Sequence, residues 1–171
     1  MHIIAVASGR SGSGKTLFLE KLVSRLAMEG CRVPVVKHIH HGGLTLLEGK
    51  DTERIFKAGA GIAAAYAGDL SMILLRGVGI EEILRIVQET TGSDVILAEG
   101  FRGQAIADEY IYIVSGPEDQ GCLDLEREGK LLLTTSLSLH KAPQCPRFKP
   151  LDEAVEEIAS IILSRYCQRF A

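Results

Sequence analysis

The segment GRSGSGKT at residues 9–16 constrains the fold of this chain most strongly. It matches the pattern GxxxxGK[ST], with an apolar run at residues 3–7 before it and an amphipathic pattern after it. Its glycines let the backbone curl so that N–H groups converge on an anion at the positive end of the following helix. The segment therefore predicts a phosphate-binding loop (P-loop), formed by Gly9, Arg10, Ser11, Gly12, Ser13, Gly14, Lys15 and Thr16.

The chemistry of a P-loop assigns roles to its last two residues. Lys15 is predicted to neutralise the β- and γ-phosphates of a nucleotide and thereby to act in catalysis, and Thr16 is predicted to offer its hydroxyl to Mg²⁺. A plain glycine- and serine-rich turn is the alternative, which the strand before the loop and the helix after it disfavour.

Short apolar runs alternate with helical patterns along the whole chain. Strands are predicted at residues 2–8, 33–37, 62–67, 71–76, 94–99, 109–115 and 130–135. Helices are predicted at residues 14–29, 80–89 and 151–166, where apolar side chains recur at helical spacing, and another is predicted to start at 49–52. This alternation predicts a single α/β domain over residues 1–171, with the P-loop NTPase fold and a mainly parallel sheet of about seven strands flanked by helices. The sheet would be mixed if residues 68–76 pair back as a hairpin.

A carboxylate follows the apolar run VILA, at Glu99. Ligands gather outside the carboxyl ends of parallel strands, so Glu99 is expected on the same rim as the P-loop. There it is predicted to hold Mg²⁺ or to position the attacking water. Arg102, three residues later, is either a phosphate contact or a solvated loop arginine.

Three histidines cluster in KHIHH at residues 37–41, directly after a predicted strand. Lys37, His38, His40 and His41 are predicted to contact phosphate or substrate; acid/base chemistry, a transition-metal site and a solvated polar loop are the alternatives. Asp51 is predicted to cap the next helix, and it is a second candidate for the Mg²⁺ shell.

Charge and composition exclude several classes of protein. Lys and Arg number 19 against 22 Asp and Glu, for a net charge of −3, which argues against a nucleic-acid partner. No apolar run approaches the length of a membrane span, and the N-terminus does not resemble a signal peptide. The four widely spaced cysteines predict reduced thiols in a cytoplasmic protein.

Four ordered blocks resemble the molybdopterin-guanine dinucleotide biosynthesis protein B (MobB) family. They are GRSGSGKT at 9–16, VKHIHHG at 36–42, GKDTERIFKAGA at 49–60 and ILAEGFRG at 96–103. The stretch after the histidines departs from the family: GGLTLLEG at 42–49 holds one acidic residue where the family is rich in aspartate. Metal chelation by this loop is therefore not expected.

The resemblance implies a cytoplasmic homodimer that binds GTP with Mg²⁺, hydrolyses it weakly, and assists molybdopterin guanylyltransferase. Molybdopterin itself or a molybdoenzyme is a further partner that it suggests. No NKxD element for reading guanine is present, so the preference for GTP over ATP rests on the resemblance alone. The alternative function is a small-molecule P-loop kinase, although residues 116–130 hold only Arg127 and Lys130 as basic groups for a lid.

Overall fold

The computed structural model describes residues 1–39, 51–101, 103–137 and 144–167 of the chain. It falls into two compact units. One consists of Met1–His38 and Gln88–Ala171, and the other of Ile39–Val87. Within the described residues, none of the helices is long and apolar enough to cross a bilayer.

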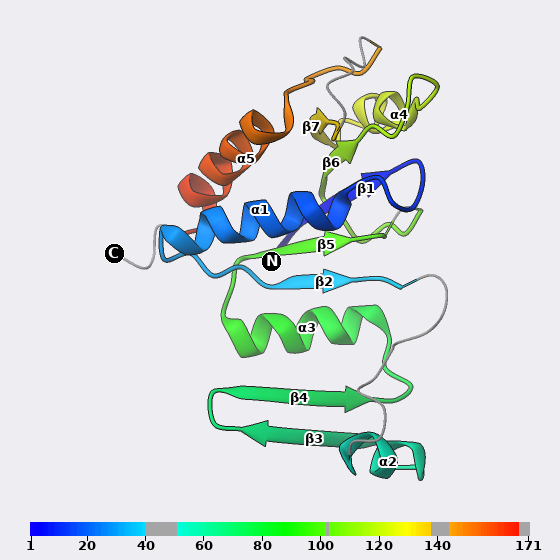
Figure 1. The fold of residues 1–171 in the computed structure, drawn as a ribbon, viewed down its shortest axis with the longest axis vertical. Helices are drawn as coiled ribbons and strands as arrows, with labels where there is room; N and C mark the ends of the chain where they lie inside the picture. The colour runs from blue at the N-terminus through cyan, green and yellow to red at the C-terminus, as the bar shows by residue number, and fades with distance from the viewer. Residues whose placement is uncertain (40–50, 102, 138–143, 168–171) are drawn as a thin grey trace. The chain divides into compact units, whose positions relative to one another are not determined.

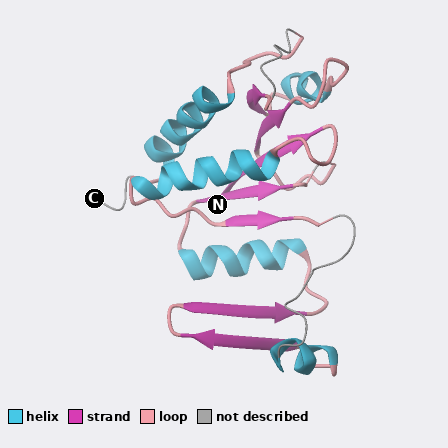
Figure 2. Cartoon of the chain, viewed as in Figure 1, coloured by secondary structure: helices cyan, strands magenta, loops and turns pink. Residues whose placement is uncertain are grey.

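Twelve elements make up the described chain (Figures 1 and 2). In chain order they are β1 (His2–Ser8), α1 (Lys15–Met28), β2 (Val35–Lys37), α2 (Asp51–Lys57), β3 (Ile62–Ala67), β4 (Leu70–Leu75), α3 (Ile80–Thr91), β5 (Val95–Glu99), β6 (Glu109–Ile113), α4 (Gly121–Arg127), β7 (Leu131–Thr135) and α5 (Leu151–Tyr166).

Five strands form the sheet of the first unit, in the order β2-β5-β1-β6-β7. All four neighbouring pairs are parallel. A parallel sheet is covered on both faces, which explains why β5 is buried at all five of its positions. The register pairs Val6 with Glu99 and Lys37 with Glu99, so the carboxyl ends of β1, β2 and β5 meet beside the loop that leaves β1.

Helices α1 and α5 pack together over one face of this sheet (Figure 1). Phe18, Leu22 and Leu26 lie on the predicted stripe of α1 and are fully buried. They join apolar residues of β1, β5, β6 and β7 in one core. This arrangement anchors α1 and so fixes the position of the loop that precedes it.

Strands β3 and β4 form a separate antiparallel hairpin in the second unit. This hairpin was one possibility raised by the sequence, and the part of the chain that the structure describes contains seven strands. Its inclusion in a single mixed sheet is wrong: the five-stranded sheet is wholly parallel, and the hairpin is a sheet of its own. Helix α2 contacts β3 within this unit.

The structure corrects the prediction of four reduced thiols. Cys31 is bonded to Cys167, and Cys122 is bonded to Cys145, so none of the described cysteines is free. The first disulfide joins the segment after α1 to the end of α5. The second joins α4 to the segment that precedes α5.

Candidate functional site

Residues 9–16 form a loop from the end of β1 to the start of α1, as predicted. Gly12 and Gly14 have φ angles of 70° and 94°, in the left-handed region that favours glycine. Gly14 caps α1 without a side chain, and the first turn of the helix carries no acidic residue. The first N–H groups of this 14-residue helix thus face the loop with no side-chain cap, the arrangement that binds phosphate in P-loop proteins.

Lys15 lies over its own loop. Its Nζ atom donates to Ser8 Oγ at 2.7 Å, to the Arg10 carbonyl at 3.1 Å and to Ser13 Oγ at 3.3 Å. Burial lowers the pKa of Lys15; Glu99 raises it in part, and Lys37 lowers it further. Two lysines and the helix end therefore concentrate positive charge where a triphosphate would lie.

Thr16, Lys37 and Glu99 meet at the rim formed by α1, β2 and β5. The Thr16 hydroxyl lies 3.0 Å from both Glu99 carboxylate oxygens. The Lys37 ammonium lies 3.0 Å from Glu99 Oε1 and donates to Thr16 Oγ1 at 3.1 Å. Glu99 is only 7% exposed. The structure thus brings together Thr16 and Glu99, which were predicted as metal-binding residues, and adds Lys37 as their direct partner.

The donor set of this rim fits Mg²⁺. Mg²⁺ prefers oxygen ligands and is commonly held by one or two protein groups together with substrate phosphates and water. The Thr16 hydroxyl and the Glu99 carboxylate are two such oxygen groups, already side by side. Among the described residues, no group of three His, Cys, Asp or Glu side chains forms a metal site independent of a nucleotide.

His38 lies next to this rim. Its backbone N–H donates to the Glu99 carbonyl at 2.8 Å, and its ring stacks on Phe101 with centroids 5.2 Å apart. Between them, Gly100 has a φ of +90°, and a Cβ atom there would lie 2.9 Å from the His38 carbonyl oxygen. The glycine therefore allows β2 and β5 to end in close contact, with His38 beside Glu99.

The remaining predicted site residues lie in the second unit or outside the described residues. Asp51 begins α2 in the second unit, where its carboxylate lies 3.4 Å from Arg54. Its role in the Mg²⁺ shell stays a prediction. His40, His41 and Arg102 lie outside the described residues.

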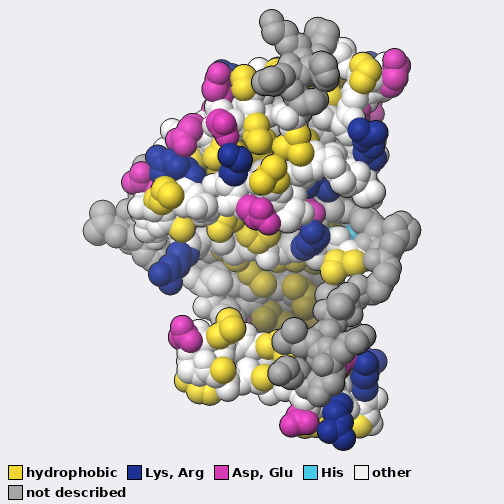
Figure 3. All heavy atoms as spheres, in the orientation of Figure 1, with side chains coloured by type: hydrophobic (Ala, Val, Ile, Leu, Met, Phe, Trp, Pro, Cys, Tyr) yellow, Lys and Arg dark blue, Asp and Glu magenta, His cyan; other side chains and the backbone are white. Residues whose placement is uncertain are grey.

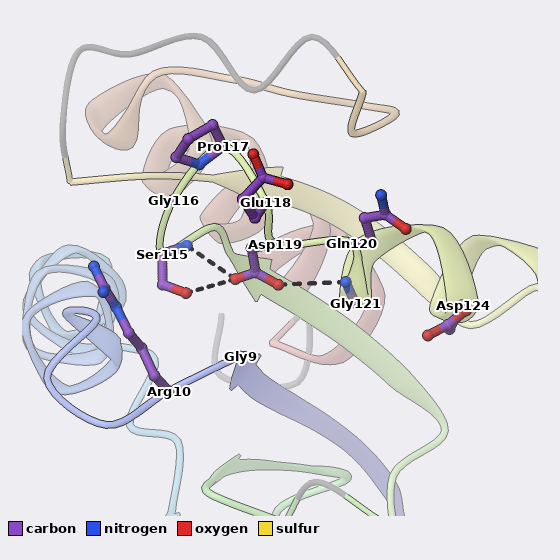
Figure 4. Close-up of a pocket in the computed structure, with 10 residues that line it drawn as sticks. All are labelled: Gly9, Arg10, Ser115, Gly116, Pro117, Glu118, Asp119, Gln120, Gly121 and Asp124. Carbon is purple, nitrogen blue, oxygen red and sulfur yellow. Dashed lines mark hydrogen bonds between the residues drawn. The ribbon is translucent and has the colours of Figure 1, made fainter.

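A pocket of about 600 Å³ beside the P-loop was missed by the sequence reasoning (Figure 4). It lies between Gly9 and Arg10 on one side and the turn at residues 115–121, together with Asp124, on the other. The segment SGPEDQG resembles an ordinary polar loop, and its only sequence signal is that it directly follows a predicted strand of the sheet.

Comparison with known proteins places these features in context. The family model described as molybdopterin guanine dinucleotide synthesis protein B matches residues 3–124. The chain is 36% identical over 97 residues to the probable molybdopterin-guanine dinucleotide biosynthesis adapter protein of Bacillus subtilis. The aligned segment covers 55% of this chain and 56% of that protein. The chain is 35% identical over 103 residues to the Haemophilus influenzae adapter protein, covering 58% and 57%. The matches thus span little more than half of these relatives.

Solved structures share the fold over nearly the whole chain. Bacillus subtilis MobB superposes with a TM-score of 0.65 at 22% identity, over 97% of this chain and 98% of that one. A MobB homologue from Bacillus stearothermophilus gives a TM-score of 0.67 at 20% identity, over 96% and 100%. These matches confirm the predicted α/β fold with a mainly parallel sheet flanked by helices.

Proposed function

Because this chain belongs to the molybdopterin guanine dinucleotide synthesis protein B family, we propose that it binds Mg²⁺–GTP at residues 9–16 and acts as an adapter protein in molybdopterin-guanine dinucleotide biosynthesis. The proposal of nucleotide binding is supported by the direct contacts among Thr16, Lys37 and Glu99 at the rim beside Lys15. The relatives' names carry the adapter part.

Each residue of the rim has a defined task in this proposal. The backbone N–H groups of residues 12–16 bind the phosphates, and Lys15 leaves its loop contacts to neutralise the β- and γ-phosphates. When Mg²⁺ is bound by Thr16 and the phosphates, it neutralises charge that develops on the transferred group. Glu99 orients a water toward the γ-phosphate, while the contact with the Lys37 ammonium holds this carboxylate in place.

Slow hydrolysis is consistent with this set of groups. P-loop enzymes with rapid turnover place an arginine on the transferring phosphate. In residues 116–130, which would form the lid of a kinase, Arg127 is the sole arginine, and it lies 3.4 Å from Asp124 instead. No observation on this segment favours the alternative of a small-molecule kinase. The preference for guanine is proposed from family membership.

The adapter role predicts a complex with molybdopterin guanylyltransferase. The purified chain and the guanylyltransferase from the same genome should associate, and association should change at least about threefold between Mg²⁺–GTP and no nucleotide, as nucleotide-linked coupling requires. Biolayer interferometry measures both states, and a nucleotidyltransferase of unrelated substrate is the control. Equal capture of the two enzymes would contradict the adapter role.

We also propose that the chain forms a homodimer through the hairpin of β3 and β4. Its exposed apolar side chains are Ile62, Tyr66, Leu70 and Ile73, at 59–80% exposure. Figure 3 shows apolar side chains at the surface over these strands. A two-stranded sheet is marginal alone, and both outer edges of this one lack a strand partner among the described residues. A second copy supplies both an apolar face and strand edges of matching length.

The dimer proposal predicts that Ile73→Asp converts the dimer to monomer, because an unpaired charge would be buried at the interface. We expect the dimer dissociation constant to rise by about hundredfold, measured by sedimentation or light scattering over a concentration series. Met28→Asp is the matched control, because Met28 is an apolar residue on α1 that is still more exposed than Ile73, at 78% against 59%. An unaltered dimer in Ile73→Asp, or a monomeric parent protein, would exclude this interface.

A further inference from the structure

The pocket beside the P-loop has a rigid inner wall, formed by Asp119. Its carboxylate accepts hydrogen bonds from the hydroxyls of Tyr112 and Ser115, both at 2.6 Å, and from the backbone N–H groups of Ser115 at 3.0 Å and Gly121 at 3.3 Å. Burial raises the pKa of Asp119, but these hydrogen bonds outweigh it and leave the pKa below its ordinary value. Asp119 thus holds the turn through both of its carboxylate oxygens. The dashed lines of Figure 4 mark its hydrogen bonds with Ser115 and Gly121.

The same carboxylate lies close to the P-loop. A Cβ atom on Gly9 would lie 2.9 Å from Asp119 Oδ2, so the glycine permits this close approach. On its other side the turn is held by Gln144, whose side chain donates to the Pro117 carbonyl at 2.6 Å, and by the bond between Cys122 and Cys145. Asp119, Gln144 and the disulfide therefore hold the turn, and the pocket is formed within the first unit.

The side chains around the opening are not used by the fold. Among the described residues, the side chains of Arg10, Glu118 and Gln120 have no hydrogen-bond or ion-pair partner. Figure 4 shows Arg10 on one side of the pocket, Gln120 and Asp124 on the other, and Glu118 at the rim. A guanidinium binds phosphate in bidentate fashion. A carboxylate accepts two parallel hydrogen bonds from a ring N–H and a neighbouring amine.

We propose that this pocket binds a phosphate-bearing aminopyrimidinone, beside the triphosphate site that residues 12–16 form. Arg10 contacts the phosphate, and Glu118 accepts from the ring N–H and exocyclic amine, with Gln120 beside the ring. A volume of about 600 Å³ suits a bicyclic ring with a short phosphorylated side chain. A pterin phosphate and a guanine mononucleotide share this chemistry. The choice of a pterin as ligand rests on the proposed function, because the family's name contains both molybdopterin and guanine.

The test measures binding of neopterin monophosphate, GMP and AMP to the full chain by calorimetry. The first two carry the N–H and amine edge, whereas AMP does not. We expect neopterin monophosphate, GMP or both to bind. The affinity for AMP should be at least about tenfold weaker, because AMP cannot donate these hydrogen bonds to the charged carboxylate. Tighter binding of neopterin monophosphate would identify the ligand as a pterin, and tighter binding of GMP would identify it as a guanine nucleotide. Equal binding of AMP, or no binding of either ring at millimolar concentration, would overturn the proposal.

Two variants separate this site from the P-loop. Glu118→Gln should lower the affinity for the ring ligand at least about tenfold and leave the affinity for Mg²⁺–GTP unchanged. Glu153→Gln, an exposed carboxylate of α5, is its matched control. Lys15→Ala should leave ring binding intact. If Lys15→Ala abolishes it, the ring occupies the P-loop and the proposal is wrong. If ring binding survives while Mg²⁺–GTP binds neither the parent chain nor any variant, the pocket stands and the proposed nucleotide function fails.

Discussion

Lys15→Ala is expected to reduce the affinity for Mg²⁺–GTP by at least about hundredfold, since a charge-assisted hydrogen bond is worth about 1.5–3 kcal/mol and Lys15 is placed to contact two phosphates. In the structure its ammonium lies against Ser8, Arg10 and Ser13, so its charge is already held over the loop. Isothermal titration calorimetry measures the change directly.

Lys21→Ala is the matched control for this experiment. Lys21 lies two turns along the same helix, and its ammonium is 3.0 Å from the exposed carboxylate of Asp152. An exposed pair of this kind contributes about 0–1 kcal/mol to stability, so the variant should fold and bind GTP like the parent chain. Unchanged affinity in Lys15→Ala would remove the P-loop from the nucleotide site.

Glu99→Gln is expected to slow GTP hydrolysis by about hundredfold, because a positioned general base or water-orienting carboxylate typically contributes about 10²–10⁴-fold to the rate. The amide keeps the size of the side chain, but it presents an N–H group or a weaker acceptor to Thr16 and Lys37. The affinity for GTP should stay within about threefold, since removal of a negative charge beside the phosphates does not oppose their binding. Single-turnover phosphate release and calorimetry separate the two quantities.

The matched control is Glu20→Gln, an exposed carboxylate on α1. It removes the same charge from the same unit without touching the rim. If Glu99→Gln and Glu20→Gln hydrolyse GTP at equal rates, Glu99 has no part in catalysis. A parallel loss of binding and rate in Glu99→Gln would instead assign it to nucleotide binding alone.

Much of the fold was predictable because local sequence patterns determine single elements. The bounds of β1, β3 and α5 agree with prediction. Helix α4 was missed. It has only seven residues, and its one buried residue is Cys122, so it carries no apolar stripe. The order of strands along the sequence does not show which strands share a sheet. The mainly parallel sheet was therefore predicted correctly, but β3 and β4 were wrongly counted among its strands.

The candidate site was predictable in its residues and not in its contacts. The placement of Thr16 and Glu99 on one rim followed from their positions at strand and helix ends. The direct contact of Lys37 with both required the register of β2 against β5, which no local pattern encodes. The two disulfides were not predicted for the same reason, because the bonded cysteines are 136 and 23 residues apart in the sequence. The role of Asp119 in the pocket wall could not be predicted either, because its hydrogen bonds form only in the folded turn.

The central place of β1 in the sheet has a consequence for synthesis of the protein. Its two neighbours are β5 and β6, whose pairing residues lie about a hundred residues further along the chain, as in His2 with Val95 and Ile4 with Glu109. At about 5–20 residues per second, β1 leaves the ribosome about 5–20 seconds before either neighbour. During that interval an apolar strand waits unpaired, and the P-loop cannot be complete. Nucleotide therefore cannot guide early folding of this chain, and chaperone engagement is expected to centre on its first strand.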